Sequence, residues 1–178
     1  MKKLWILALA VGSAAVVSAP MALKAQATPA AQAAPAAAKP DFTGTWTLDL
    51  GKSVYGPVPS PNSEINVVSQ SGDDFKIAFT QVGGAGTLNY TVVFKADGTE
   101  VPIPKDGFPA NSDLQILSTK GEWQNGVLVL TQKATYQGMN VTISARYTLS
   151  DDGKELTKLT NYSTEQGDYD TKTVYAKS

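Results

Sequence analysis

The sequence DFTGTWTLDLGKSVYGPVPSP, residues 41–61, decides the fold, because every later segment reads as a strand that must close onto its first half. Gly44 lacks a Cβ, so it permits a sharp bend or a close backbone approach at the start of a barrel strand. Trp46 can plug a barrel end, since an indole buries up to ~250 Å². Trp46 shares one face with Leu48 and Leu50, which predicts a half-buried strand. An ordinary first strand with a core tryptophan accounts for the same pattern.

The remainder of the domain is a succession of alternating segments separated by turn signals. Turns are predicted at Gly72, Gly83, Gly98, Gly126, Gly138, Gly153 and Gly167, each within a polar or glycine-rich cluster. Val, Ile, Thr and Tyr dominate the segments between them, as strands favour. Hairpin-linked strands pair with their sequence neighbours. The prediction is an all-β protein, an antiparallel up-and-down closed β-barrel of 8–10 strands that buries its apolar face and removes its edges.

The apolar side of each strand is expected to face inward. In the segment 63–69, Ile65 and Val67 lie on one side and Glu64 and Asn66 on the other. Phe75, Ile77 and Phe79 alternate in the next segment, and the following segments repeat the pattern. A transmembrane barrel is disfavoured, because the opposite face carries Lys, Asn, Ser, Thr and Arg side chains that water solvates better than lipid does.

The first 40 residues do not resemble the barrel. Residues 1–27 have a basic start, an apolar stretch and the A-x-A site Ala25-Gln26-Ala27, which predicts a secretory signal peptide. An uncleaved membrane anchor is the alternative, although the apolar stretch is short for a span. Residues 28–40 form an Ala/Pro-rich linker, expected to be disordered or extended. The barrel domain is then residues 41–178, exported to the periplasm or the extracellular space.

Absent residue types exclude several kinds of chemistry. The chain has no Cys and no His, which removes disulfides, Ser-His-Asp and Cys-His catalysis, most zinc sites and His-ligated haem. Loss of Lys2, Lys3 and Lys24 with the signal peptide reduces 15 basic residues to 12 against 16 acidic ones, a net charge of −4. Nucleic-acid binding and docking of the mature form on anionic membranes are therefore not expected.

Two irregular loops interrupt the hairpins. Residues 51–62 contain Gly51, Gly56 and three prolines, which block both helix and central strand. Long loops often serve as lids, so Tyr55 and Val58 are candidate lid residues, with a structural strap as the alternative. Residues 104–112 are the second loop.

Strand parity assigns a set of side chains to the barrel lumen, where they are candidates for ligand binding. An apolar wall with a few hydroxyl and amide groups is typical of a small-molecule pocket, although a narrow barrel can also fill itself with such side chains. The set is Phe79, Gln81, Tyr90, Leu130, Gln132, Tyr136, Tyr147, Thr160, Tyr162, Thr173 and Tyr175.

No catalytic or metal site is predicted. The acid pairs Asp73/Asp74 and Asp151/Asp152 lie beside turn glycines, where Asp is preferred for backbone reasons. Calcium needs several converging oxygens, and no D-x-D-x-D loop is present. No cofactor is expected.

The opening Phe42-x-Gly44-Thr45-Trp46 resembles the first strand of the calycins, both lipocalins and fatty-acid-binding proteins. Later motifs resemble secreted bacterial lipocalin-like proteins: Leu50-x-Lys52-Ser53-x-x-Gly56-Pro57-x-Pro59, Arg146-Tyr147-x-Leu149-Ser150-x-Asp152-Gly153-Lys154-x-Leu156-Thr157 and Val174-Tyr175-x-Lys177. The resemblance implies a barrel with a central cavity for a small, mostly apolar molecule. It also implies that a late-strand cation covers the motif tryptophan, and we expect Arg146, the one arginine, to cover Trp46 there, unless it is a solvated charge.

The chain departs from the fatty-acid-binding pattern in two places. Those proteins carry R-x-Y at the end, whereas this chain has Thr173 two residues before Tyr175, so a charged grip for a carboxylate is not expected. Residues 51–61 cannot form the two lid helices of that family.

The expected function is an exported, non-catalytic protein that binds a small apolar or amphipathic molecule in its lumen. A secreted structural or protein-interaction barrel with a filled interior is the alternative, and a carboxylate-based hydrolase is a third. The oligomeric state is open. A cavity above about 300 Å³ favours the first function, a filled interior with an exposed apolar patch favours the second, and two inward acids favour the third.

Overall fold

Ten antiparallel strands form one continuous sheet in the computed structural model, which describes residues 39–84, 86–104 and 112–178. The elements are β1 (Gly44–Leu48), a short 3-10 helix η1 (Leu50–Lys52), β2 (Ser63–Ser71), β3 (Asp74–Gly83), β4 (Gly86–Lys95), β5 (Asp97–Pro102), β6 (Leu114–Gln124), β7 (Val127–Tyr136), β8 (Met139–Leu149), β9 (Glu155–Thr164) and β10 (Gly167–Lys177). The predicted signal peptide, nearly all of the predicted linker and most of the loop 104–112 lie outside the described residues.

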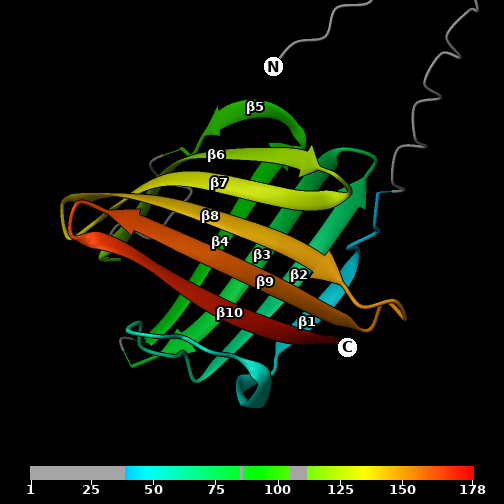
Figure 1. Cartoon of the computed structure of the whole chain (residues 1–178), viewed down its shortest axis with the longest axis horizontal. Coiled ribbons are helices and arrows are strands. Elements are labelled where there is room, and N and C mark those ends of the chain that lie inside the picture. Colours follow the sequence, from blue (N-terminus) through cyan, green and yellow to red (C-terminus); the bar gives the residue numbers. More distant parts are fainter. Residues whose placement is uncertain (1–38, 85, 105–111) are drawn as a thin grey trace, which may run out of the picture. The chain divides into compact units, whose positions relative to one another are not determined.

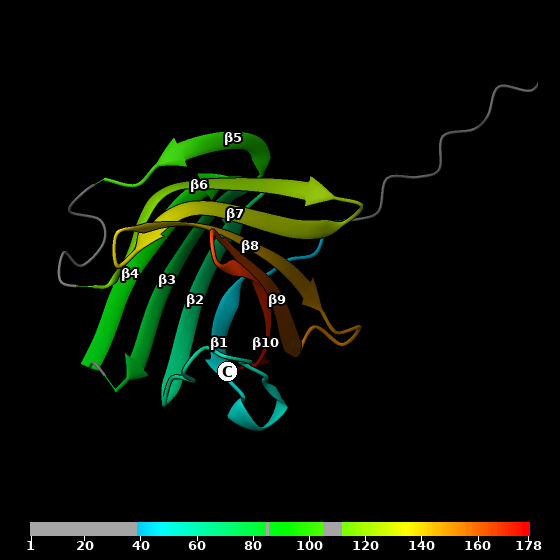
Figure 2. The same ribbon diagram turned by 60° about the vertical axis from the view of Figure 1, so that its left-hand side comes forward.

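The strand order is that of an up-and-down barrel. It runs β4-β3-β2-β1-β10-β9-β8-β7-β6-β5, so every neighbour except the β1–β10 pair is also a neighbour in sequence. In Figure 1, strands β6 to β10 lie in front of β2 to β4 and cross them, and the interior lies between these two groups. Figure 2 shows β1 beside β10, the contact that joins the first strand of the sheet to the last. The predicted all-β antiparallel barrel is confirmed, with ten strands.

The barrel is nearly, but not fully, closed by hydrogen bonds, because the order of paired strands ends at β4 on one side and at β5 on the other. Side chains fill the seam between β4 and β6. The Phe94 ring of β4 is 3% exposed and lies over Gly121 of β6, where an added Cβ would overlap the ring. Phe94 also stacks on Phe75, with ring centroids 5.1 Å apart and planes 2° apart. Packing therefore replaces backbone pairing at this seam.

The opening motif closes one end of the barrel. Trp46 is fully buried, and its Nε1 donates a hydrogen bond to the Phe42 carbonyl at 2.8 Å. The Phe42 ring in turn packs against Phe75 and Trp123 at centroid distances of 6.5 and 6.2 Å. Trp46 therefore sits in the aromatic cluster that plugs this end, as the sequence predicts.

The cation over Trp46 is Lys177, and the prediction that Arg146 covers it is wrong. Lys177 is the cross-strand partner of Trp46, and its Nζ lies 5.2 Å from the indole centroid. Arg146 is exposed on the outer face of β8 and donates to Gln124. Gly44, at φ +146°, makes room for the lysine, because a Cβ there would lie 2.7 Å from Cε of Lys177. Strand parity explains the error, since Arg146 lies on the opposite face from the inward Tyr147.

Strand β2 has the opposite phase to the one expected. Ile65 and Val67 are 41% and 46% exposed on the outer face, whereas Glu64 and Asn66 are 6% and 3% exposed in the interior. The pairing of β2 with β1 and β3 sets this phase, since Asn66 lies between Trp46 and Phe79, both of which face inward. Alternation alone assigned the apolar residues of this strand to the wrong side.

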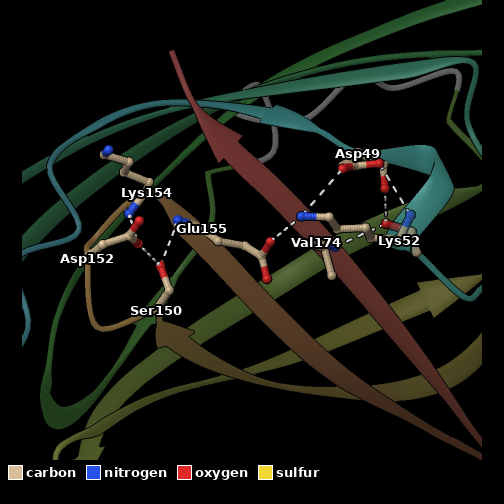
Figure 3. A network of polar contacts seen from close by, with 8 residues as sticks. Asp49, Lys52, Ser150, Asp152, Lys154, Glu155 and Val174 are labelled. Atoms are coloured by element: carbon tan, nitrogen blue, oxygen red, sulfur yellow. Dashed lines mark hydrogen bonds and ion pairs between the residues drawn. The ribbon is translucent and has the colours of Figure 1, made fainter.

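The loop after η1 is a strap in the barrel wall. Because β1 is short, it pairs with only the last residues of β10, and Val54 bridges Lys172 further along the same edge. Figure 3 shows the contact that holds η1 to β9, in which Lys52 pairs with Glu155 at 2.5 Å. The Asp49 amide also donates to the Val174 carbonyl of β10 at 2.8 Å. The loop therefore completes the wall between β10 and β2.

No helix among the described residues is long and apolar enough to cross a membrane.

Candidate functional site

A buried ion pair lies in the barrel interior. Nζ of Lys158, on β9, is 3.7 Å from Oε1 of Glu64, on β2, and the two side chains are 16% and 7% exposed. Lys158 reaches the interior because the inward parity of β9 runs through Leu156, Lys158 and Thr160. The ammonium also lies 5.4 Å from the centroid of the Tyr175 ring.

Three neutral side chains complete the hydrogen bonding of the Glu64 carboxylate. Its Oε1 accepts from Tyr175 Oη at 2.8 Å and from Asn66 Nδ2 at 3.0 Å, and its Oε2 accepts from Gln81 Nε2 at 3.3 Å. The donors come from β10, β2 and β3, so the cluster ties together strands on both sides of β1. We call these five residues, Glu64, Asn66, Gln81, Lys158 and Tyr175, the lumen polar cluster.

Both members of the pair are held in their charged forms. Burial raises the pKa of the Glu64 carboxyl, but the Lys158 charge and the hydrogen bonds from Asn66 and Tyr175 outweigh this, so its pKa lies below the ordinary value of 4.5. Burial lowers the pKa of the Lys158 ammonium, but the Glu64 carboxylate outweighs it and the net pKa lies well above 10.5. The site is therefore an ion pair with no net charge.

Tyrosines surround the cluster. Burial, opposed by the Lys158 charge, raises the pKa of Tyr175 to about 12. Burial also raises the pKa of Tyr147 and of Tyr90, and the negative charge of Glu64 adds to both shifts. These phenols are neutral at physiological pH and act as hydrogen-bonding groups, not as bases.

The strap brings a further tyrosine toward the cluster. The Tyr55 hydroxyl is buried, and burial together with the nearby Glu64 charge raises the pKa of this phenol. Val58 is half-buried in the same loop. The structure thus places Tyr55, one of the two predicted lid residues, in the wall beside the interior.

An enclosed cavity of about 10 Å³ lies in the interior, on the Trp46 side of the cluster. Its lining is hydrocarbon or aromatic except for Asn66: Phe42, Val68, Phe75, Ile77, Phe79, Leu128, Tyr147 and Leu156. This space is far smaller than the ~300 Å³ of a typical small-molecule pocket. The part of the lumen that these described residues line is therefore packed.

Besides the Tyr55 hydroxyl in the strap, two buried polar atoms of the described residues have no hydrogen-bond partner. They are Oδ1 of Asn66, which lines the cavity, and Oγ1 of Thr160, two residues beyond Lys158. A buried polar group without a partner costs free energy, so such atoms often mark functional sites. Here both lie on strands of the lumen polar cluster.

Most of the predicted lumen residues do face inward. Phe79, Leu130, Gln132, Tyr147, Thr160, Thr173 and Tyr175 are at most 9% exposed, and Gln81, Tyr90 and Tyr162 are half-buried. Phe79 and Tyr90 stack with centroids 4.5 Å apart. Tyr136 differs, because it is the last residue of β7 and is 43% exposed. That any of these residues binds a ligand stays a prediction.

Sequence reasoning missed Glu64, Asn66 and Lys158. The parity that placed Thr160 and Tyr162 inward also places Lys158 inward, so this signal was available. Lys158 stands opposite Thr173 on the neighbouring strand. The Lys158 ammonium thus lies beside Thr173, the position where the sequence offers no charged side chain for a ligand carboxylate. Glu64 already pairs with this ammonium.

The described residues give no support to paired-carboxylate hydrolysis. Within residues 39–84, 86–104 and 112–178, Glu64 is the one buried acid. Asp74, Asp151 and Asp152 are exposed in or next to turns, and Asp73 accepts hydrogen bonds from Lys39 and Trp123. A search of the same residues finds no group of three potential metal ligands.

Comparison with known proteins supports the fold. No protein-family model matches the chain, and no curated protein matches it. The chain is similar to the zebrafish ileal bile acid-binding protein complexed with cholic acid, at a TM-score of 0.51 and 18% identity, over 77% of this chain and 98% of that one. It is also similar to an abundant heat soluble (SAHS) protein from Ramazzottius varieornatus, at a TM-score of 0.47 and 15% identity, over 77% and 95%. The first of these likenesses agrees with the fold described above, an up-and-down antiparallel β-barrel.

Proposed function

We propose that this protein is an exported, non-catalytic carrier that holds one small, mostly apolar or amphipathic molecule in the barrel lumen. The observation that supports it best is the lumen polar cluster. A buried ion pair is weak support for stability, because desolvation offsets its attraction, and a hydrocarbon core of similar volume is often as stable. A charged pair with an adjacent unpartnered amide oxygen therefore fits a binding site better than a purely structural core.

The fold supports the same proposal. The similar zebrafish protein is a bile acid-binding protein with cholic acid bound. By analogy, a small molecule with an apolar body and a polar group would suit the mixture of aromatic walls and polar cluster in this lumen.

In the part of the lumen that the described residues line, a ligand larger than a water molecule must displace side chains, because the cavity there measures only about 10 Å³. The lumen residues Leu88, Tyr90, Ile103, Leu114 and Tyr162 are half-buried and pack against Ile116, Ala134, Val141 and Ile143. These less buried side chains can move at lower cost than the aromatic plug around Trp46.

A filled barrel that acts through its outer face is the second candidate. The small cavity favours it, as do Ile65, Val67 and Val93, which are 41%, 46% and 57% exposed on the outer faces of β2 and β4. In this alternative the polar cluster serves only to fix the packing of the interior.

Export is supported by residues 1–27, with their basic start, apolar stretch and A-x-A site. Mass spectrometry of the protein from its own source should find a mature chain that begins near Thr28. An intact N-terminus would contradict export by cleavage.

The carrier proposal is tested by titration with N-phenyl-1-naphthylamine, a neutral apolar fluorophore, and by native mass spectrometry for a co-purified ligand. Ala145→Leu adds volume inside the lumen, and Ala78→Leu adds the same volume on the outer face, since Ala145 is 5% exposed and Ala78 is on the outward parity of β3. We expect saturable binding that Ala145→Leu abolishes and Ala78→Leu preserves. No binding, together with no co-purified mass, would favour the filled barrel.

A further inference from the structure

The unpartnered amide oxygen of Asn66 is the feature of the lumen that points to a ligand group. Asn66 is 3% exposed, its Oδ1 has no hydrogen-bond partner, and it is one of the residues that line the enclosed cavity. A water molecule in a cavity needs two to four polar partners. Among the other lining residues only Tyr147 carries a polar group, its phenol hydroxyl, so a water here would have few partners and a ligand donor can serve Oδ1 instead.

The neighbouring carboxylate fixes which end of the Asn66 amide faces the cavity. Nδ2 donates to Glu64 Oε1 at 3.0 Å. The flipped amide would place its oxygen against the carboxylate, with two acceptors in contact and no proton between them. Asn66 therefore offers an acceptor to the cavity, and the matching ligand group is a donor.

The ion pair limits the charge of that group. Lys158 is already neutralised by Glu64 at 3.7 Å, and the Glu64 oxygens already accept from Tyr175, Asn66 and Gln81. An anionic head group would add a buried charge with no free cation beside it, and a cationic head group would lack a free anion. An uncharged group leaves the pair intact.

We propose, on the basis of the carrier function above, that the ligand is an uncharged amphiphile whose hydroxyl or amide N–H donates to Oδ1 of Asn66. The Glu64–Lys158 pair acts as a charge filter that rejects carboxylates and amines with the same hydrocarbon body.

The experiment compares the affinities of the protein for 1-hexanol, hexanoate and hexylamine at pH 7. Each titration is monitored through the chemical shift of the Asn66 side-chain amide. We expect the alcohol to bind about tenfold or more tightly than the acid and the amine, since an uncompensated buried charge outweighs a hydrogen bond. Equal affinity for hexanol and hexanoate in the wild-type protein would overturn the proposal without any variant.

Two amide variants separate the roles of Asn66. Asn66→Leu and Gln81→Leu each remove one donor to Glu64, but only Asn66→Leu removes the cavity acceptor. Hexanol affinity should fall about tenfold in Asn66→Leu and by clearly less in Gln81→Leu, which loses a donor to Glu64 but keeps the cavity acceptor. Equal losses would mean that Asn66 acts only through Glu64. Should Asn66→Leu fail to fold, Asn66→Ala removes the same oxygen without adding volume.

Glu64→Gln tests the charge filter in the opposite direction. It frees the Lys158 charge, so the ratio of hexanoate affinity to hexanol affinity should rise about tenfold. If the neutral fluorophore binds in the lumen but all three hexyl probes bind alike, the head-group proposal is wrong and the carrier function stands. If neither the fluorophore nor any hexyl probe binds, the carrier function itself is wrong.

Discussion

Nζ of Lys158 lies 3.7 Å from Oε1 of Glu64, although their strands β9 and β2 are separated in the sheet by β10 and β1. The pair therefore spans the inside of the curved wall. Tyr175, on the intervening β10, donates to the same Glu64 oxygen at 2.8 Å. The β1–β10 pairing and the curvature of the sheet bring these residues together.

Removing one member of the pair should destabilise the protein strongly. Lys158→Met leaves the Glu64 carboxylate buried without its cation, and we expect a loss of about 3–5 kcal/mol in the free energy of unfolding. The double variant Glu64→Gln/Lys158→Met should recover most of this loss. Urea unfolding gives both values, and Lys133→Met, at an exposed pair with Glu100, is the control that should change little. A double variant as unstable as the single one would contradict the assignment of a buried pair.

The stability of the protein should depend on pH in a defined direction. The pKa of Glu64 is lower in the folded than in the unfolded chain, so its stabilisation is complete above about 4.5 and is lost as the pH falls through the folded-state value. The pKa of Lys158 is raised, so its stabilisation is complete below 10.5 and is lost only as the pH rises through its higher folded-state value. Unfolding measured from pH 3 to pH 7 checks the acid side.

In Lys158→Met the acid dependence of the Glu64 contribution should reverse. Burial without the cation raises the pKa of this carboxyl, so protonation then favours the folded state. The difference in stability between wild type and variant should shrink first above pH 4.5, as the variant carboxyl protonates at its raised pKa, and again below 4.5, as the wild type loses its own stabilisation. A constant difference would show that Glu64 does not titrate with the pair.

The hydroxyl of Tyr175 should contribute measurably to stability. Tyr175→Phe removes a 2.8 Å hydrogen bond to a buried carboxylate, and we expect a loss of about 1.5–3 kcal/mol. The same variant should remove one ionisation near pH 12 from a spectrophotometric tyrosine titration, since burial raises the pKa of Tyr175 to about 12. Tyr136→Phe, at a 43% exposed position, is the matched control.

The seam between β4 and β6 should tolerate no added methyl group. Gly121→Ala places a Cβ against the Phe94 ring, which is itself held by its stack on Phe75, and overpacking of this kind costs about 1–3 kcal/mol. Gly83→Ala is the control, since nothing lies within 4 Å of a Cβ there. Phe94→Leu in the Gly121→Ala background should restore part of the loss. Equal stability of the two alanine variants would mean that the seam opens freely.

The order of the strands was predictable from local signals. Turn residues such as Asn125-Gly126 mark the hairpins, and both residues adopt positive φ angles of 52° and 82° there. Phe75, Ile77 and Phe79 alternate with polar residues, and this gives the inward face of β3 correctly. Gly44 and Trp46 likewise follow from local chemistry, because a close approach and a large buried ring each need one residue type.

The site was not predictable in the same way. Glu64 and Asn66 look like the solvated side of a strand whose other side is Ile65 and Val67, and only the pairing with β1 and β3 turns them inward. A buried charge is stable only beside its partner, and that partner, Lys158, lies far along the chain.

The sequence by itself determined the hairpins, the up-and-down order of the strands and the aromatic plug, since these depend on residues close together in the chain. The tertiary structure decided which face of β2 is inside, which cation covers Trp46 and which charges meet in the lumen. These features depend on register between distant strands, and register is set when the barrel closes.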